Sequence, residues 1–238
     1  MSGRTLIVTR PEGKATEDLK CEGLEIINVP VTRLEDVPFN TDEFRSFNPD
    51  IVIVTSSRSA DIMDKNTGLF GPNRIYVSIG RITRQALKSI GLDSVVPHEQ
   101  TSAGIIQLLE RNAWKTSRIA LITSQQSNMI VRDFLQKKGY NYRLFTVYRS
   151  VALDSSALSK YMKRGCLGIV VTSSQEAETI LKDHTLSEQI SKAETRIFAI
   201  GKTTADTIRK MGFAPAEPVG SSILQDLICQ IRERYLQK

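Results

Sequence analysis

The sequence predicts an α/β protein built from two parallel-sheet lobes, and two observations support this. The first is a repeat. Residues 51–57 read IVIVTSS and residues 168–174 read GIVVTSS, and residues 78–91 (SIGRITRQALKSIG) resemble residues 199–212 (AIGKTTADTIRKMG). The second is the alternation of short β-branched runs with amphipathic stretches, which is typical of βαβ units. Because both motifs recur in the same order and at nearly the same spacing, the chain contains a duplicated unit, and two such lobes would form a ligand-binding cleft.

The expected strands are short runs rich in Ile, Val and Leu. Several lack the apolar–polar alternation of a half-exposed strand, so they are expected to be buried on both faces of a parallel sheet. These strands are residues 5–9, 25–29, 50–55, 75–79, 94–96, 118–123, 142–147, 167–172 and 196–200.

The expected helices lie between these strands. Four of them end before a glycine, namely Gly23, Gly91, Gly139 or Gly212. Glycine adopts the left-handed conformation that closes a helix, so these positions are helix stops. The helices are residues 14–22, 57–65, 81–90, 102–113, 127–138, 156–163, 174–183, 187–192, 202–211 and 221–236.

Two segments without a clear period are candidate connections between the lobes. They are residues 30–38 (PVTRLEDVP) and residues 148–154 (YRSVALD), which share an extended character. The repeat by itself favours two sequential halves that divide near residue 117.

Composition favours a globular protein that binds an anion. The chain has 238 residues, of which 40% are hydrophobic and 24% charged, and its net charge is +6. No apolar run approaches the ~20 residues of a membrane helix, and MSGRTLIVTRP reads as a first strand rather than a signal peptide. The basic residues are scattered and form no nucleic-acid-binding motif. An anionic small molecule is therefore a better expected partner than nucleic acid or a membrane.

The few cysteines and histidines predict neither a metal site nor a redox pair. Cys21, Cys166 and Cys229 are widely spaced and are interpreted as reduced thiols of a cytosolic protein. His98 and His184 are too few for a histidine-based metal centre or triad.

Hydroxyl residues follow one strand in each copy of the repeat. Thr55-Ser56-Ser57 and Thr172-Ser173-Ser174 each stand between a buried strand and a helix. Ligands of open α/β sheets bind at such strand ends, where helix N–H groups favour carboxylates or phosphates. Plain helix capping is the alternative for both triplets.

A second junction in each copy combines glycine, a basic residue and a hydroxyl. These are Gly80-Arg81-Ile82-Thr83 and Gly201-Lys202-Thr203-Thr204. They resemble an anion cradle, but neither matches a P-loop or a dinucleotide fingerprint. Nucleotide binding therefore has no motif in its favour.

Arg10 and Tyr148 are the remaining candidates with chemistry at strand ends. Arg10 could bind a carboxylate or only solvate its loop, and Tyr148 could donate a hydrogen bond or only pack. No catalytic triad, carboxylate pair or cysteine–histidine pair stands out. An enzyme with this sequence would work by positioning and electrostatics.

Taken together, the motifs resemble the uroporphyrinogen-III synthase family over essentially the whole chain. They are VTRP, the first TSS junction, SIG-x-x-T-x-x-AL-x-x-x-G, VYR, the second VTSS and AIGKTTADTIRKMG, in that order. The resemblance implies two flavodoxin-like parallel-sheet lobes, a two-stranded linker and a cleft between the lobes. One lobe would be residues 1–32 plus 152–238, the other the insert 38–147, with 33–37 and 148–151 as linker.

The resemblance also implies a reaction. The family cyclises hydroxymethylbilane, a polyanionic linear tetrapyrrole, to uroporphyrinogen III with loss of water and inversion of ring D, on the route to heme or siroheme. It implies a lyase with no metal or organic cofactor, acting as a cytoplasmic monomer with hydroxymethylbilane synthase as a transient partner. Tyr148 is the implied catalytic residue. The substrate-binding candidates are Arg10, Thr55, Ser56, Ser57, Gly80, Thr83, Ser102, Thr172, Ser173, Ser174, Gly201, Lys202, Thr203 and Thr204.

Two departures from the family concern the insert. It has TSSRSAD where the family commonly continues with a small residue and Ala-Val, and it has Ile82 where the second copy has Thr203. We therefore expect the discontinuous lobe, with Tyr148 in or beside it, to carry more of the chemistry. A non-catalytic two-lobed binding protein for an anionic metabolite is the alternative function, and a nucleotide-using enzyme is a weaker third.

Overall fold

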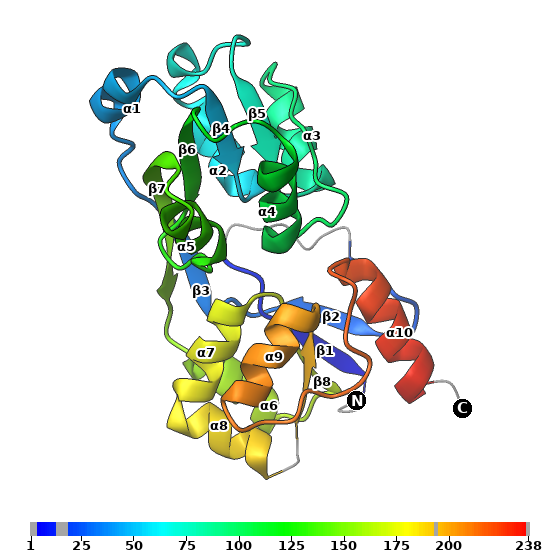
Figure 1. Cartoon of the computed structure of the whole chain (residues 1–238). Helices are drawn as coiled ribbons and strands as arrows, with labels where there is room; N and C mark the ends of the chain where they lie inside the picture. Colours follow the sequence, from blue (N-terminus) through cyan, green and yellow to red (C-terminus); the bar gives the residue numbers. More distant parts are fainter. Residues whose placement is uncertain (1–3, 13–18, 193–194, 237–238) are drawn as a thin grey trace. The chain divides into compact units, whose positions relative to one another are not determined.

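The computed structural model describes residues 4–12, 19–192 and 195–236, which belong to two compact units (Figure 1). The discontinuous unit comprises Met1–Leu34 and Ser150–Lys238, and the inserted unit comprises Glu35–Arg149. The predicted α/β class with parallel sheets is confirmed. The predicted break near residue 117 is wrong, because that position lies inside the inserted unit.

The five-stranded sheet of the inserted unit has the order β3-β7-β6-β4-β5, and its edge strand β3 begins in the discontinuous unit. Strand β4 pairs in parallel with β5 and β6, and β6 pairs in parallel with β7. The strands are β3 (Thr32–Asp36), β4 (Ile51–Val54), β5 (Ile75–Ser78), β6 (Arg118–Ser124) and β7 (Asn141–Ala152). The helices are α1 (Thr41–Phe47), α2 (Ser57–Asp64), the 3₁₀ helix η1 (Thr67–Leu69), α3 (Arg81–Ser89), α4 (Ser102–Arg111) and α5 (Ile130–Lys137).

Helices cover both faces of this sheet. Residues of α1, α2 and α3 pack on one face around Val52 and Val54, and residues of α4 and α5 pack on the other around Ile51 and Ile53. The run IVIV of β4 is fully buried, as the missing alternation in the sequence predicts.

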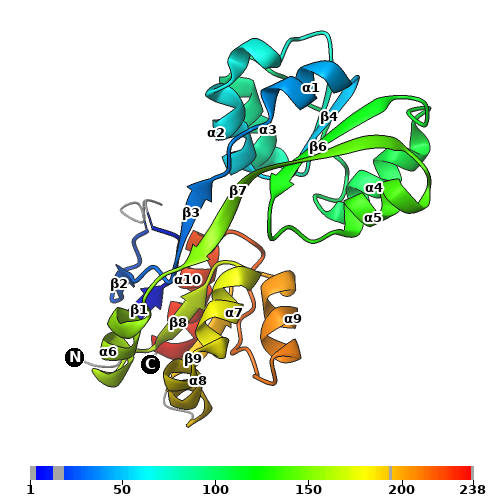
Figure 2. The ribbon, with the colours of Figure 1, turned by 90° about the vertical axis from the view of Figure 1, so that its left-hand side faces the viewer.

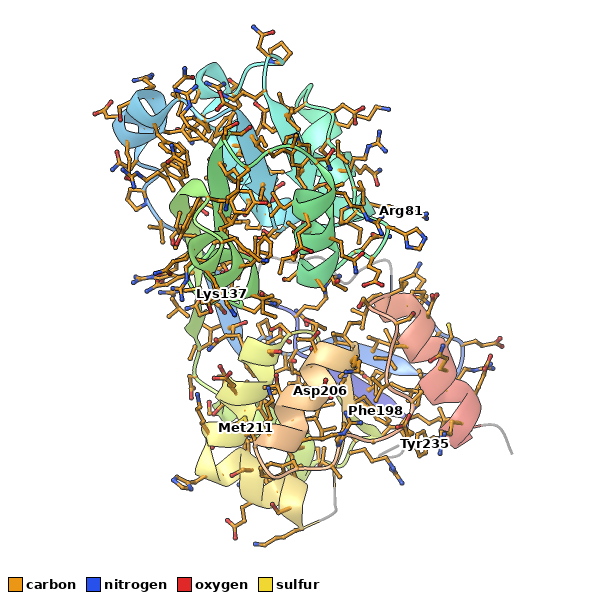
Figure 3. All side chains as sticks on the ribbon, in the orientation of Figure 1. Arg81, Lys137, Phe198, Asp206, Met211 and Tyr235 are labelled. Carbon is orange, nitrogen blue, oxygen red and sulfur yellow. The ribbon has the colours of Figure 1, made fainter. Side chains whose placement is uncertain are left out.

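The discontinuous unit has a four-stranded sheet with the order β2-β1-β8-β9 and parallel pairing throughout. Helices α6 to α9 pack on one face and α10 on the other, where Phe198 and Tyr235 meet edge to face at 5.7 Å (Figure 3). The strands are β1 (Thr5–Val8), β2 (Glu25–Asn28), β8 (Gly168–Val171) and β9 (Arg196–Ala199). The helices are α6 (Ser156–Lys163), α7 (Ser174–Lys182), α8 (His184–Ser191), α9 (Lys202–Lys210) and α10 (Leu224–Leu236).

The two sheets have the same layout but a different chain order. The TSS motif follows β4 in one sheet and β8 in the other, and the IG motif follows β5 and β9. Strands β6 and β7 then occupy the places of β1 and β2, so the orders β7-β6-β4-β5 and β2-β1-β8-β9 coincide. The repeat is therefore circularly permuted, which explains why its two motifs do not mark two sequential halves.

Strands β3 and β7 run side by side and carry the chain across both boundaries of the inserted unit (Figure 2). The Val37 N–H donates to the Val147 oxygen at 2.9 Å, and the Arg149 guanidinium meets Glu35 at 2.9 Å. The residues expected as linker, 33–37 and 148–151, lie mainly in these two strands.

Most of the other expected elements are present, although β3 lies in a segment expected only as a connection and η1 was not expected. There are three further differences. Strand 94–96 is reduced to one bridge between Val95 and Val77. Of the expected helix 14–22, residues 13–18 lie outside the described residues and residues 19–22 are not helical. Helix α1 was not expected; Asn40 caps its start and Phe44 anchors it in the core. Within the described ranges, no helix is long and apolar enough to cross a membrane.

Gly168 offers a test of the packing in the discontinuous unit. A Cβ atom at this position would lie 2.6 Å from Phe198 Cε2 and 2.7 Å from the Arg196 oxygen. We therefore expect Gly168→Ala to lower the free energy of unfolding by about 1–3 kcal/mol, the usual effect of overpacking. Denaturant unfolding measures this. Gly68→Ala is the control, because a Cβ there meets nothing within 4 Å, and equal stability of the two variants would contradict the prediction.

Candidate functional site

The inserted unit has a cavity of about 220 Å³ at the carboxyl ends of its strands. Such ends are where open α/β sheets bind ligands. Three of the predicted site residues line it, namely Thr55, Ser102 and Tyr148. The sequence did not single out the other polar lining residues, which are Thr123, Ser124, Ser127, Asn128 and Arg132.

A local irregularity of β7 immediately precedes Tyr148. Thr123 of β6 pairs with Thr146, but Ser124 pairs with Tyr148, so Val147 is an extra residue in the ladder. Such bulges re-aim the side chains that follow them. The Tyr148 hydroxyl donates to Ser56 Oγ at 3.1 Å. Tyr148 thus lies in the inserted unit, beside its boundary with the discontinuous one at Arg149.

Ser56 has a structural role as well. Its Oγ accepts the Ser59 N–H at 3.1 Å and caps α2, while Ser57 is the first residue of that helix. The Thr55 hydroxyl lies 2.9 Å from Thr123 Oγ1 and 3.3 Å from the Ile122 oxygen. The TSS triplet therefore caps a helix and lines the cavity at the same time.

At the junction of residues 80–83 in the inserted unit, the side chain of Gln100 already binds the start of the helix. Gly80 is the extended N-cap residue of α3, and Gln100 Oε1 accepts the Arg81 N–H at 2.8 Å. Thr83 is only 4% exposed, whereas Ile82 is 72% exposed. The Arg81 side chain reaches away from the start of α3 (Figure 3). A glutamine of the chain itself thus fills the expected anion cradle.

The matching junction of the discontinuous unit differs. Gly201 is the extended N-cap residue of α9, as Gly80 is of α3, but among the described residues no side chain takes the place that Gln100 has at α3. Lys202 lies at the surface with its Nζ 3.2 Å from Asp206, and this contact lowers the Asp206 pKa. Thr203 is exposed, whereas Thr204 is 4% exposed. The basic residue and exposed hydroxyl make this the more accessible of the two IG junctions.

The triplet after β8 is tied to both its neighbouring helices. Ser173 Oγ accepts the Glu176 N–H at 3.2 Å and caps α7. Ser174 Oγ accepts from Thr207 Oγ1 at 2.9 Å and lies 3.5 Å from the Thr203 oxygen. The structure therefore brings the TSS and IG junctions of this unit together, along neighbouring α7 and α9.

Arg10 is half-buried and lies two residues beyond Val8, where β1 ends. Its backbone oxygen accepts from Asn28 Nδ2 at 3.4 Å. The residue before it, Thr9, is fully buried and places its hydroxyl 2.8 Å from Glu176 Oε2. Arg10 therefore stands at the carboxyl end of the strand beside β8, at the same edge as the second triplet.

Glu176 is a feature that the sequence interpretation missed. It is 0% exposed, and burial raises its pKa against the opposing effect of hydrogen bonds from Thr172, Thr9 and Ser173. The pattern Ser173-x-x-Glu176 is a capping box, which could have revealed it. Here the carboxylate reaches past the cap to the Thr172 N–H at 2.8 Å.

Cys21 and Cys229 are neighbours in the structure, although they lie far apart in the sequence. The pKa of Cys21 is raised by burial and by the neighbouring Cys229 thiol, and both are free. In the part of the chain that the structure describes, no three His, Cys, Asp or Glu residues form a group suited to a metal ion.

The raised pKa of Glu176 predicts a pH-dependent contribution to stability. Because the folded protein holds this proton more tightly than the unfolded chain, wild-type stability should fall relative to Glu176→Gln as pH rises above its ordinary value of 4.5 and through the raised pKa. Urea unfolding of both proteins between pH 4 and pH 8 measures this. Glu178→Gln, on the exposed side of the same helix, is the control. A wild-type protein that gains relative stability over this range would contradict the prediction.

Comparisons with known proteins agree with this architecture. A family model described as uroporphyrinogen-III synthase HemD matches residues 14–222. A Methanocaldococcus jannaschii protein named "Putative uroporphyrinogen-III synthase" is 26% identical over 250 residues, with 96% of this chain and 99% of that protein covered.

Two solved structures share the fold. A mutant uroporphyrinogen III synthase of the bacterium Thermus thermophilus has a TM-score of 0.69 at 19% identity, covering 98% of this chain and 99% of that one. The uroporphyrinogen-III synthetase of Helicobacter pylori 26695 has a TM-score of 0.64 at 12% identity, covering 94% and 96%. Since the family model spans most of the sequence, the chain belongs to the uroporphyrinogen-III synthase family.

Proposed function

We propose that this protein is a uroporphyrinogen-III synthase, which cyclises hydroxymethylbilane to uroporphyrinogen III with loss of water and inversion of ring D. The family consists of cyclising lyases that act on a linear tetrapyrrole, and residues 14–222 match it. The observation that carries the proposal within the structure is the position of Tyr148, which lines the 220 Å³ cavity and whose hydroxyl lies 3.1 Å from Ser56 Oγ.

The helix N-termini would bind the substrate. Their backbone N–H groups and dipoles favour the substrate carboxylates. Helix α2 begins beside the cavity, and α9 begins without a side-chain cap and with the exposed Lys202 next to it. We assign carboxylate binding to these two helix starts, while Arg10 adds a cation to the edge of the discontinuous unit.

The chemical part falls to Tyr148. Its O–H would turn from Ser56 Oγ to the hydroxyl group on ring A and donate a hydrogen bond to it. As the C–O bond breaks, ring A gives up its N–H proton, so the hydroxyl group and this proton leave together as water and an azafulvene remains. The electron-poor methylene carbon that remains is attacked by ring D, a spiro intermediate forms, and ring D inverts as the macrocycle closes. The protein contributes by holding the chain in one geometry while charge develops.

The finer assignments follow from the same proposal. The protein would act as a monomer, because one chain carries both copies of the repeat. It would act in the cytoplasm, and its product would be used in heme or siroheme synthesis. Hydroxymethylbilane synthase would be its transient partner. Light scattering of the purified protein measures its oligomeric state, and a stable dimer would contradict the proposed monomer.

An isomer assay tests the proposed function directly. Purified protein is supplied with hydroxymethylbilane, and the products are oxidised and separated by chromatography. The proposal predicts an excess of the type III isomer over the spontaneously formed type I isomer. If only type I appears while the tetrapyrrole binds tightly, the protein is a non-catalytic binding protein, and the proposal fails.

The role of Tyr148 is tested by Tyr148→Phe, which removes only the hydroxyl. We expect kcat to fall on the order of 100-fold, as for loss of a proton donor, with little change in thermal unfolding. Tyr140→Phe is the matched control, because the Tyr140 hydroxyl binds the Leu109 oxygen and does not line the cavity. A Tyr148→Phe variant with the full wild-type rate would remove Tyr148 from the mechanism.

A further inference from the structure

The buried Glu176 carboxylate fixes the direction of the hydroxyl groups around it. Oε2 lies 2.8 Å from Thr9 Oγ1 and 2.8 Å from the Thr172 N–H nitrogen, and Oε1 lies 3.0 Å from Ser173 Oγ. Thr172 Oγ1 is 2.9 Å from Oε1 and 3.0 Å from Oε2. An ionised carboxylate only accepts hydrogen bonds, so an ionised Glu176 would make Thr172 and Ser173 direct their hydroxyl hydrogens toward it. The Thr9 hydroxyl also lies 3.2 Å from the Val170 oxygen, which is a second acceptor for its hydrogen.

This arrangement leaves Thr172 with acceptor capacity and no donor to offer. Its hydroxyl hydrogen and its backbone N–H both point to Glu176, while the lone pairs of Oγ1 remain. Thr172 is partly exposed at the carboxyl end of β8, where α/β sheets bind ligands. The group that Thr172 suits best is therefore a hydrogen-bond donor, not an anion.

The inserted unit has no acidic residue at the position that corresponds to Glu176. Ser59 stands at the position of Glu176, and its hydroxyl lies 3.0 Å from Ser56 Oγ. Among the described residues, Thr55 Oγ1 has the neutral oxygens of Ile122 and Thr123 as its hydrogen-bond partners. The fold therefore forms this junction with neutral groups, although burying a charge opposes folding. The carboxylate is not a requirement of the fold.

An ionised Glu176 would also change what the start of α7 can bind. A carboxylate at this position offsets the positive end of the helix dipole and repels other anions. In α2, the corresponding first turn carries no acidic residue, whereas α7 carries Glu176 in its first turn. The two TSS junctions therefore have opposite preferences, although their sequences are nearly the same.

We propose that Glu176 is a positioning residue that sets Thr172 Oγ1 as an acceptor for a pyrrole N–H of the tetrapyrrole, and that carboxylates of the substrate are excluded from the start of α7. This proposal rests on the proposed function, since it assigns a further contact to the same substrate.

The first experiment measures the charge of Glu176 without any ligand. In protein labelled with ¹³C-glutamate, the Glu176 carboxyl carbon is assigned by its loss in Glu176→Gln. We expect the chemical shift of an ionised carboxylate at pH 7.5, and a higher pKa in Thr172→Val, which removes one donor. A protonated Glu176 at pH 7.5 would overturn the proposal even if the protein is an active synthase.

The second experiment measures the contact through kinetics with hydroxymethylbilane. Thr172→Val and Glu176→Gln should each raise KM about tenfold, the effect of one lost hydrogen bond, with kcat within about twofold of wild type. Thr172→Ser keeps the hydroxyl and should retain the wild-type KM. The double variant should lose no more than either single variant, since both changes remove the same contact.

Other outcomes distinguish failure of the proposal for Glu176 from failure of the proposed function. Additive losses in the double variant, or an unchanged KM in Thr172→Val, would mean that Glu176 only supports the fold. If Glu176→Gln does not fold, Thr172→Val and Thr172→Ser still decide the question. If the wild-type protein forms only the type I isomer, the proposed function fails, whereas the ionisation of Glu176 is still decided by the NMR titration.

Discussion

The structure depends on one constraint: parallel strands end at the same edge of their sheet, and the helices that follow begin there. Each unit obeys it, with TSS after β4 or β8 and IG after β5 or β9. The hydroxyls, glycines and first-turn N–H groups therefore collect at one edge of each sheet, where the helix dipoles favour anions. The buried Ile, Val and Leu runs hold this edge in place, because helices cover both faces of each sheet.

The two sheets share one layout, but different side chains stand at the starts of the helices that follow their strands. In the inserted unit, Gln100 fills the start of α3, while α2 begins beside the cavity and Tyr148. In the discontinuous unit, Glu176 fills the start of α7, while α9 begins without a side-chain cap. Side chains of the protein thus contact N–H groups at three of these junctions, namely Ser56 and Gln100 in the inserted unit and Ser173 with Glu176 in the discontinuous unit.

The sequence was sufficient for the sheet strands other than β3 and for most helices, because continuous apolar runs and glycine stops are local signals. Gly91, Gly139 and Gly212 indeed have positive φ angles after their helices. Local signals failed where long-range contacts decide: β3 forms by pairing with β7, and α1 is anchored by Phe44 in the core. The same limit applies to the site. The contacts of Gln100 with Arg81 and of Glu176 with Thr9 join residues that are distant in the chain, so no spacing rule shows them.

A crystal structure of the protein with bound uroporphyrinogen III tests the central claim most directly. The account predicts carboxylates of the product within hydrogen-bond distance of backbone N–H groups in the first turns of α2 and α9. It also predicts a pyrrole N–H, not a carboxylate, at Thr172. Product carboxylates bound at the start of α7, or a product bound away from the carboxyl ends of the strands, would contradict the account.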